Sequence, residues 1–283
     1  MSRERTLGIA QITSADSRSG SLERSLEAAR HLFDRGARVV VLPELIVPGY
    51  RLDRDFLEAG ADPLDGPVTA AWHELAARAD GFIAAGFCER DGDRLYNSAV
   101  LIGPQGIALH YRKLHRFAAE KEIFAPGDLG LPVARTEIGV IGLCICYDLR
   151  FVETVRILAL QGAELVCVPT AWLPGFDQQR WDSEGYCPQA RGAVLQANLD
   201  QVHIACASQA GPANGLHFLG SSVVCDPYGA VALGPLPGEE PELALVTIDL
   251  DAVARAHDRG ALINPAQDRR SDVYGLSVAG TVL

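Results

Sequence analysis

The sequence of 283 residues predicts a layered α/β fold with mixed sheets. Apolar runs of strand length alternate with segments whose apolar residues recur at the helical period. Some neighbouring strand segments are joined by short turns rich in Pro and Gly, which is typical of antiparallel hairpins. Hydrophobic residues make up 48% of the sequence, enough for a substantial core. Strands paired as hairpins and strands separated by helices together indicate mixed sheets covered by helices.

The N-terminal part of the sequence predicts a β-α-β unit followed by a hairpin. Apolar runs over 7–12 and 39–42 flank a helical pattern, whose expected N-cap is Ser21 and whose expected C-terminal glycine is Gly36. The elements expected next are a helix over 68–79 and strands over 82–88, 95–102 and 107–112. The turn Gly103-Pro104-Gln105-Gly106 predicts that the last two strands are antiparallel.

The C-terminal part of the sequence repeats the alternation of strands and helices. The elements expected there are strands over 140–145, 165–168, 202–207 and 243–248, helices over 152–162 and about 191–199, and a hairpin at 226–229. The run over 140–145 is almost continuously apolar, as in a strand that is buried on both faces. No linker or low-complexity stretch interrupts the series, so we expect a single domain over 1–283.

The composition favours an enzyme that acts on a small molecule. With 25 Lys and Arg against 36 Asp and Glu, the formal net charge is −11, which disfavours binding to nucleic acid or to an anionic membrane. No apolar run approaches the roughly 18 residues needed to cross a bilayer, and the polar N-terminus does not resemble a signal peptide. We therefore expect a cytoplasmic protein.

The cysteines and histidines predict neither disulfides nor a metal centre. The seven cysteines are an odd number and lie mostly in strand-like apolar runs, so we expect reduced core thiols. The seven histidines are dispersed, and the sequence contains no CxxC or HxxxH pair. No metal and no cofactor are predicted.

Cys146 is the cysteine whose position most favours catalysis. It lies between an apolar strand and a helical pattern, where free backbone N–H groups and the positive end of a helix favour a thiolate. The same N–H groups can stabilise the oxyanion that forms when a thiolate attacks a carbonyl. The alternative interpretation is another small buried thiol.

Two charged residues follow predicted strands in a similar way. Glu44 comes after the run 39–42 and Pro43, at a strand end where α/β proteins collect functional groups, and its carboxylate can deprotonate a thiol. Lys113 ends the strand over 107–112 and can place an ammonium against a developing oxyanion. Taken alone, each residue also fits an ordinary capping or solvated role.

In their order and spacing, these residues lie in motifs similar to those of the nitrilase superfamily. The three central motifs are Leu42-Pro43-Glu44, Tyr111-Arg112-Lys113-Leu114-His115 and Cys146-Tyr147-Asp148-Leu149-Arg150-Phe151. Further matches are Glu120 with Gly127, the segment Gly162-Ala163-Glu164-Leu165, the segment Phe218-Leu219-Gly220-Ser221-Ser222, and 268–274. The resemblance covers nearly the whole chain.

The resemblance implies a fold and an assembly. The expected fold is a four-layer α-β-β-α sandwich with mixed sheets, formed by one carbon-nitrogen hydrolase domain. Such proteins commonly pair into homodimers or larger homo-oligomers. We expect the C-terminal tail, about 258–283, to take part in subunit contacts.

The resemblance also implies a role for each site residue. Glu44 corresponds to the general base, Cys146 to the nucleophile, and Lys113 to the residue that stabilises the tetrahedral intermediate. Glu120 corresponds to a second glutamate that orients the site. The backbone N–H of Tyr147 is expected to assist Lys113 in binding the oxyanion.

The residues after Cys146 bear on the substrate. True nitrilases usually carry Trp-Glu-Asn there, whereas this chain has Tyr147-Asp148-Leu149, which favours the amidase and carbamoylase branch. Arg150 resembles the arginine with which relatives bind carboxylate-bearing substrates, and a guanidinium can bind a carboxylate bidentately. The alternative is an ion pair between Arg150 and Asp148 or another carboxylate. The candidate aromatic walls of the substrate pocket are Tyr50, Trp172 and Phe176.

The sequence thus predicts cysteine-dependent hydrolysis of a non-peptide C–N bond in a small amide or N-carbamoyl substrate. The expected route passes through a thioester and releases ammonia or an amine. Nitrile hydrolysis and a catalytically silent binding subunit on the same fold are alternatives. A papain-like cysteine hydrolase is a third alternative, and it requires a histidine such as His115 or His203.

Overall fold

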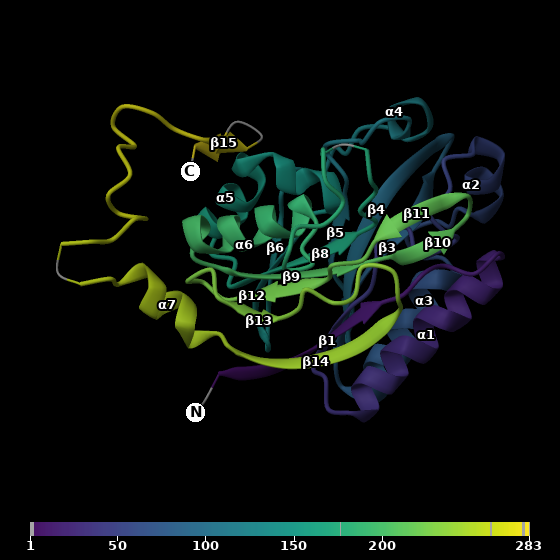
Figure 1. Ribbon diagram of the computed structural model, residues 1–283, viewed down its shortest axis with the longest axis horizontal. Helices are drawn as coiled ribbons and strands as arrows, with labels where there is room; N and C mark the ends of the chain where they lie inside the picture. Colours follow the sequence, from purple (N-terminus) through teal and green to yellow (C-terminus); the bar gives the residue numbers. More distant parts are fainter. Residues whose placement is uncertain (1–2, 176, 261, 279–280, 283) are drawn as a thin grey trace.

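Two six-stranded mixed sheets form the centre of the protein, which a computed structural model describes over residues 3–175, 177–260, 262–278 and 281–282 (Figure 1). The first sheet contains, in spatial order, β14 (Glu242–Asp249), β1 (Glu4–Gln11), β2 (Val39–Val41), β3 (Phe82–Asp91), β4 (Arg94–Gly103) and β5 (Gly106–Arg112). The second contains β13 (Val231–Leu233), β12 (Val223–Cys225), β9 (His203–Ser208), β8 (Leu165–Thr170), β7 (Gly139–Leu143) and β6 (Val133–Thr136).

The two sheets have the same internal plan. Three parallel strands form the centre of each sheet, β1 to β3 in the first and β7 to β9 in the second. Antiparallel strands extend each sheet on both sides, and the hairpin from β4 to β5 is the one that the sequence predicts. The mixed sheets expected from the sequence are therefore confirmed.

Helices cover the outer face of each sheet (Figure 1). The covering helices are α1 (Arg18–Asp34) and α3 (Pro67–Ala79) on the first sheet, and α5 (Val152–Leu160) and α6 (Pro188–Asp200) on the second. The shorter elements are α2 (Arg54–Gly60), α4 (Glu120–Ile123), the 3₁₀ helix η1 (Cys146–Arg150), β10 (Ala210–Ala213), β11 (Leu216–Leu219), α7 (Asp251–His257), β15 (Ser277–Val278) and β16 (Thr281–Val282). The order of layers is α-β-β-α, as predicted.

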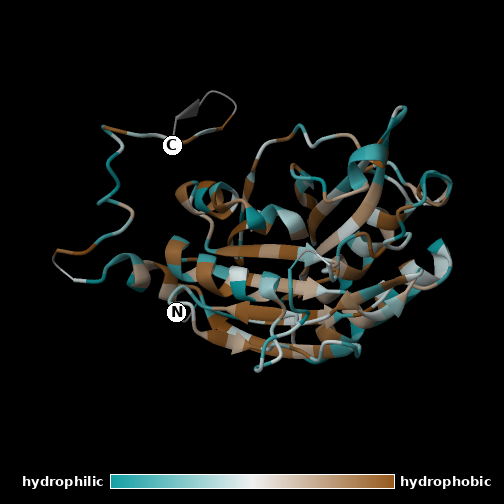
Figure 2. Cartoon of the chain, turned by 45° about the horizontal axis from the view of Figure 1, so that its top comes forward, coloured by the Kyte–Doolittle hydropathy of each residue, from teal (hydrophilic) through white to brown (hydrophobic). Residues whose placement is uncertain are grey.

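Strand β2 shows how one short sequence fills two cores. Successive side chains of a strand point to opposite faces of the sheet. Val39 and Val41 therefore belong to the core between the two sheets, and Val40 packs in the core beneath α1 and α3. Both faces of β2 are buried, which explains why the strand consists of valines alone. Figure 2 shows that the central strands are coloured as hydrophobic along most of their length.

The start of α1 differs from the prediction. Ser17 is the N-cap, and its hydroxyl accepts a hydrogen bond from the N–H of Gly20 over 3.2 Å. Ser21 lies inside the helix, where its hydroxyl donates to the carbonyl of Pro48 over 2.9 Å. The expected cap at Ser21 was therefore wrong, because this serine binds a neighbouring loop. Gly36 follows the helix with a φ of 96°, in the left-handed region that favours glycine.

The segment after Cys146 also differs from the prediction. The strand that precedes it ends at Leu143, and Cys146 begins the short 3₁₀ helix η1. The α-helix α5 starts only at Val152. Cys146 therefore does not lie at the start of an α-helix, so the predicted field of a helix macrodipole is weak there.

The C-terminal segment leaves the sandwich and returns to it. Beyond α7 the chain runs outside the layers before β15 comes back near α5 (Figure 1). Tyr274 and Leu276 share a depression with Val152 and Arg156 of α5. Within the described residues, no helix is both long and apolar enough to span a bilayer.

A buried ionic network joins β3 to β5 in the first sheet. Glu89 is 1% exposed and pairs with Arg112 on β5. Burial opposes ionisation of Glu89, but hydrogen bonds from His110, Arg112 and Ser98 outweigh it and lower the pKa to about 2. Arg112 also pairs with Asp128 over 3.1 Å. The guanidinium thus ties β3, β5 and the following loop together.

Glu89→Gln tests this network. We expect the free energy of unfolding at pH 7 to fall by about 3 kcal/mol, because the variant removes one partner of a buried ion pair. The measurement is urea denaturation of both proteins. The folded-state pKa lies below the ordinary 4.5, so this contribution is present above pH 4.5 and is lost as the pH falls towards 2.

Asp128→Asn is the matched control for Glu89→Gln. Asp128 pairs with the same guanidinium, but its side chain is 52% exposed, so we expect a loss below about 1 kcal/mol. Equal losses for the two variants would contradict the assignment of the stability to the buried carboxylate.

Candidate active site

The predicted catalytic residues come from both sheets and meet where the sheets face each other. Glu44 follows β2 and Lys113 follows β5 in the first sheet, whereas Cys146 follows β7 in the second. Backbone contacts join the two sheets at this point: the N–H of Glu44 donates to the carbonyl of Thr170 over 3.3 Å. The side chain of Gln209 donates to the carbonyl of Glu44 over 3.0 Å. The backbone of Glu44 is therefore fixed by the opposite sheet.

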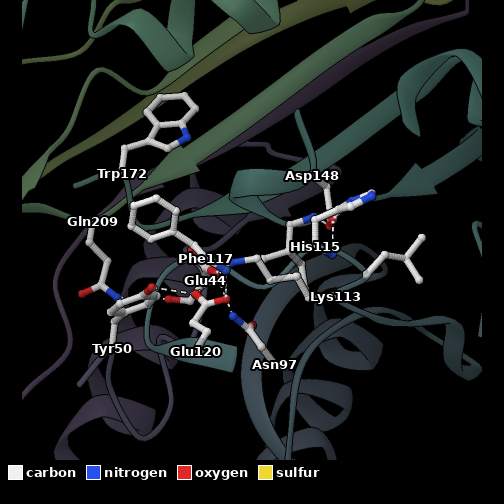
Figure 3. A network of polar contacts seen from close by, with 12 residues as sticks. Glu44, Tyr50, Asn97, Lys113, His115, Phe117, Glu120, Asp148, Trp172 and Gln209 are labelled. Atoms are coloured by element: carbon white, nitrogen blue, oxygen red, sulfur yellow. Dashed lines mark hydrogen bonds and ion pairs between the residues drawn. The ribbon is translucent and has the colours of Figure 1, made fainter. Parts of the chain in front are cut away.

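Lys113 lies between two buried carboxylates (Figure 3). Its Nζ donates to Oε1 of Glu44 over 2.6 Å and to Oε1 of Glu120 over 2.9 Å. The three side chains are 1% exposed or less. Asn97 of β4 donates a further hydrogen bond to Oε1 of Glu44 over 2.7 Å. The ammonium thus pairs with both acids at once, and the group carries a net negative charge when both are ionised.

Glu120 has its own fixed partners (Figure 3). The hydroxyl of Tyr50 donates to its Oε1 over 2.6 Å, and the N–H of Phe117 donates to its Oε2 over 2.9 Å. Because Tyr50 is almost fully buried, burial and then the neighbouring carboxylates raise the pKa of its phenol well above the ordinary value. The phenol therefore stays protonated and keeps donating to Glu120.

Gly127 permits the close approach that holds Lys113. Its N–H donates to the carbonyl of Lys113 over 3.0 Å. A Cβ at this position would lie 2.0 Å from the carbonyl oxygen of Arg112. Only glycine fits here, which gives a physical reason for one of the residues in the sequence motif.

Cys146 differs from the other described cysteines in its exposure. It is partly exposed, whereas the other six are buried. Its φ is 47°, a left-handed conformation that is uncommon for a residue with a side chain. The backbone N–H of Ala171, after β8, opposes the rise in the pKa of its thiol. The backbone at Cys146 therefore turns sharply where this residue lines a cavity.

Electrostatics keep the proton on Cys146 in the resting state. Burial raises the pKa of the thiol well above the ordinary value, the Glu44 carboxylate raises it further, and Lys113 opposes the increase. Burial also raises the pKa of Glu44, with Lys113 again opposing it. Oε2 of Glu44 accepts no hydrogen bond from the residues that the structure describes. One carboxylate oxygen is therefore engaged by Lys113 and the other is left for a proton.

A cavity of about 220 Å³ opens beside Cys146. Its aromatic wall consists of Tyr50, Phe117, Tyr147 and Trp172. Helix α6 contributes Gln189, Gly192, Leu195 and Gln196. The wall is predominantly apolar, and Arg150 is its one charged side chain among the lining residues that the structure describes. The cavity suits a small, largely apolar molecule with few polar groups.

The predicted pocket residues are brought to this cavity. Tyr50, Trp172, Tyr147 and Arg150 line it, and Phe176 lies outside the described residues. Arg150 forms an ion pair with Asp177 over 3.1 Å, with side-chain exposures of 34% and 26%.

Of the ion pairs considered as the alternative role of Arg150, the one with Asp148 is not the one formed. The Asp148 carboxylate is buried and instead accepts hydrogen bonds from Tyr111, His115 and Ile145. The alternative pairing, with another carboxylate, is the one that the structure contains.

Two residues that hold Glu44 are not among the predicted site residues. Asn97 binds its carboxylate and Gln209 binds its backbone carbonyl. Asn97 lies in the apolar run of β4, and a polar residue within such a run is a usable signal. Gln209 follows the strand β9 and has no comparable signal in the sequence. Among the described residues, no group of three or more His, Cys, Asp or Glu is arranged to hold a metal ion.

Comparison with known proteins decides the family. A family model described as carbon-nitrogen hydrolase matches residues 6–258. The chain belongs to the carbon-nitrogen hydrolase family. The predicted membership of the nitrilase superfamily is thereby confirmed, and the papain-like alternative is wrong.

Relatives of this carbon-nitrogen hydrolase carry both amidase and nitrilase names. A protein named "Nitrilase" from Pyrococcus abyssi (strain GE5 / Orsay) is 33% identical over 268 residues, covering 93% of this chain and 95% of the relative. An "(R)-stereoselective amidase" from Pseudomonas sp is 31% identical over 243 residues, covering 83% and 84%. The solved structure of an amidase from Nesterenkonia sp. has a TM-score of 0.76 and 25% identity, covering 96% and 95%. The four-layer fold is confirmed by this structural likeness.

Lys113→Met tests the buried charge cluster. Without the ammonium, Glu44 and Glu120 remain as two buried carboxylates with no cation between them. We expect the free energy of unfolding at pH 8 to fall by about 3–5 kcal/mol. The loss is expected to shrink at pH 5, because burial raises the pKa of Glu44 and protonation of this carboxylate removes one of the two buried charges. Urea denaturation at both pH values measures the change.

Lys121→Met is the control for this experiment. Lys121 is exposed on α4, so its replacement is expected to change the stability by less than about 0.5 kcal/mol at either pH. If Lys113→Met and Lys121→Met have the same free energy of unfolding at both pH values, the buried charge cluster does not stabilise the fold.

Proposed function

We propose that the protein hydrolyses a non-peptide C–N bond in a small amide or N-carbamoyl substrate, with Cys146 as the nucleophile. One observation carries the proposal: Cys146 and Tyr50 line the same cavity, and the hydroxyl of Tyr50 is bonded to the buried cluster in which Lys113 joins Glu120 to Glu44. Acyl transfer requires a nucleophile, a base and a cation; Cys146 lines the cavity, and Glu44 and Lys113 belong to the cluster that reaches it through Tyr50.

The first half-reaction forms a thioester. Oε2 of Glu44 takes the thiol proton as the sulfur of Cys146 attacks the substrate carbonyl. The resulting oxyanion is stabilised by the Lys113 ammonium and the backbone N–H of Tyr147. The C–N bond then breaks, and Glu44 returns the proton to the departing nitrogen, which leaves as ammonia or an amine.

The second half-reaction consumes water. Glu44 takes a proton from a water molecule, whose oxygen attacks the thioester carbonyl, and Lys113 again stabilises the oxyanion. Collapse of this intermediate breaks the C–S bond, releases a carboxylic acid from an amide substrate or a carbamic acid from an N-carbamoyl substrate, and returns the proton to Cys146. Glu120 supports both steps by holding the ammonium in place, since it is bonded to Nζ of Lys113. The route uses no metal and no cofactor.

The amide preference is supported by the segment after Cys146 and by the relatives. Tyr147-Asp148-Leu149 differs from the motif usual in true nitrilases. Both the Pseudomonas relative and the Nesterenkonia structure are named amidases. The relative named "Nitrilase" keeps nitrile hydrolysis as a second candidate activity.

The substrate is proposed to carry a carboxylate. Arg150 lines the cavity and brings a guanidinium to a wall that is otherwise mostly apolar. Its ion pair with Asp177 is half-buried at the cavity rim, and a substrate carboxylate would have to share or replace that partner. A guanidinium offers enough donors to bind two carboxylates.

We also propose a homodimer or a larger homo-oligomer, with the tail of about 258–283 in subunit contacts. Support comes from large apolar side chains that are exposed on this tail, namely Leu262, Ile263, Val273 and Tyr274. No nucleic acid or membrane partner is proposed. A cytoplasmic location, expected from the sequence, stays a prediction.

Cys146→Ala tests the proposed activity. We expect wild-type protein to release ammonia from at least one class in a panel of ω-amides, N-carbamoyl amino acids, aliphatic amides and nitriles. The variant is expected to lose at least about 10⁴-fold in kcat, because the nucleophile is absent. Cys225→Ala is the control, since this thiol is buried in β12 outside the cavity wall.

The outcome of the panel separates the candidates. Turnover of a nitrile alone would establish the second activity. Folded wild-type protein that releases no ammonia from any compound would favour a silent binding subunit on the same fold. Activity that survives Cys146→Ala would exclude the thioester route.

Arg150→Met tests the carboxylate preference. We expect KM for carboxylate-bearing amides to rise by about 10-fold, while KM for neutral amides changes little, since one charge-assisted contact is lost. Arg156→Met is the matched control, because Arg156 pairs with Asp200 and does not line the cavity. Equal KM changes for carboxylate-bearing and neutral amides would refute the proposal that Arg150 binds the substrate carboxylate.

A further inference from the structure

Asp148 is a buried carboxylate that the proposed mechanism does not use. Its side chain is fully buried, between the two segments that carry Lys113 and Cys146. Four donors converge on its two oxygens: Oδ1 accepts from the N–H and from Nδ1 of His115, and Oδ2 accepts from the hydroxyl of Tyr111 and the N–H of Ile145. A carboxylate with this number of short contacts is rigidly held.

On one side, Asp148 holds the residues that flank Lys113. Tyr111, two residues before Lys113, donates to Oδ2 over 2.8 Å. His115, two residues after Lys113, donates its N–H to Oδ1 over 3.0 Å, and its Nδ1 lies 2.8 Å from the same oxygen (Figure 3). The backbone on both sides of the catalytic lysine is thus tied to one carboxylate.

The same tie is strengthened by neighbouring contacts. The N–H of Leu114 donates to the hydroxyl of Tyr111 over 3.2 Å. The ring of His115 stacks on Phe151, with centroids 3.6 Å apart and an interplanar angle of 11°. His115 therefore has a fixed orientation, in which Nδ1 points to Asp148 and the ring covers the end of η1.

On the other side, Asp148 shapes the turn that presents Cys146. Its Oδ2 accepts from the N–H of Ile145 over 2.9 Å, and its own N–H donates to the carbonyl of Ile145 over 2.9 Å. These two hydrogen bonds close a tight loop around Cys146. The loop holds Cys146 at its left-handed φ, a conformation that costs on the order of 1 kcal/mol unless its surroundings impose it.

A carboxylate is required at this position because every group that contacts it donates a hydrogen bond and therefore needs an acceptor oxygen. Two of the four donors are backbone N–H groups, which cannot reverse their role. An amide of the same size has one acceptor oxygen, so its NH₂ group would face either the N–H of His115 or that of Ile145. An asparagine therefore loses the contact to one of the two segments.

We propose that Asp148 is a positioning residue that sets the location of the Lys113 ammonium relative to the Cys146 sulfur. This inference rests on the proposed function, in which Lys113 stabilises the oxyanion formed at Cys146. Asp148 touches neither the substrate nor the reacting atoms in this role. It acts by fixing the segment that carries Lys113 in position relative to the segment that carries Cys146. Misplacement of catalytic groups by about 1 Å can lower a rate by about 100-fold.

Asp148→Asn is the principal test. We expect kcat on the best amide of the panel to fall by roughly 10- to 100-fold and KM to change by less than kcat. The reason is that α6 and the described part of the loop after β8, which supply much of the cavity wall, form no hydrogen bond with the Asp148 carboxylate. Rates are measured below the thermal transition and are normalised to folded protein by near-UV circular dichroism. A normal kcat per folded molecule would overturn the proposal.

Asp62→Asn is the matched control for a purely structural effect. Asp62 is also a buried carboxylate, and it accepts hydrogen bonds from Arg18 and from the N–H of Val68. It lies outside the candidate site. We expect Asp62→Asn to lower Tm while kcat per folded molecule stays at the wild-type value. Equal losses of kcat in both variants would show that Asp148 acts only through stability.

Tyr111→Phe keeps the proposal testable if Asp148→Asn fails to fold. This variant removes one of the four donors and leaves the carboxylate in place. We expect kcat to fall by roughly 3- to 10-fold at unchanged KM, less than for Asp148→Asn. An unchanged kcat in both Tyr111→Phe and His115→Ala would also overturn the positioning role.

Alkylation of Cys146 separates failure of this inference from failure of the proposed function. Iodoacetamide reacts with the thiolate whether or not an amide is hydrolysed, and Cys146→Ala supplies the background from the six buried cysteines. We expect Asp148→Asn to change the rate constant of this alkylation by at least about three-fold and to change its dependence on pH. The reason is that the sulfur moves relative to Glu44 and Lys113. A wild-type rate and profile in Asp148→Asn would refute the positioning role even if no amide is ever found to be a substrate.

Discussion

The structure depends on one buried ammonium between two carboxylates. Moving such charges out of water is costly, and the cost is offset only when each charge has close partners of opposite sign or strong hydrogen-bond donors. Lys113 meets this condition by contacting Glu44 and Glu120, which are themselves held by Asn97 and Tyr50. Since these residues come from separate elements, the charge requirement fixes where β2, β4, β5 and α4 meet.

A second buried acid makes the corresponding connection on the side of the nucleophile. Glu44 and Glu120 neutralise a cation, whereas Asp148 is satisfied by hydrogen-bond donors from Tyr111, His115 and Ile145. The first pair of acids places the ammonium, and Asp148 ties the segments around Lys113 and Cys146 to each other. Both arrangements use the low polarity between the sheets, where polar contacts are strong and unpaired groups are unfavourable.

The charged cluster and the cavity wall are built from different parts of the fold. Proteins named nitrilase and amidase align with most of this chain at similar identities of 33% and 31%. The charged cluster comes from strand ends and a short helix, whereas the cavity wall comes from α6, η1 and the loop after β8. Loops and helix surfaces tolerate changes that a buried ion cluster does not, and we therefore assign the proposed substrate preference to the wall.

The sequence by itself determined the alternation of the main strands and helices, the layered fold and, through the resemblance of its motifs, Glu44, Lys113 and Glu120 of the charged cluster. Periodicity and turn residues are local signals for strands and helices, whereas motifs in their order along the chain are signals for a site. The tertiary structure alone decided that Ser17 caps α1, that η1 precedes α5, and that Arg150 pairs with Asp177. These features depend on which partner lies nearest in space, and segments distant in sequence supply that partner only after the two sheets have packed together.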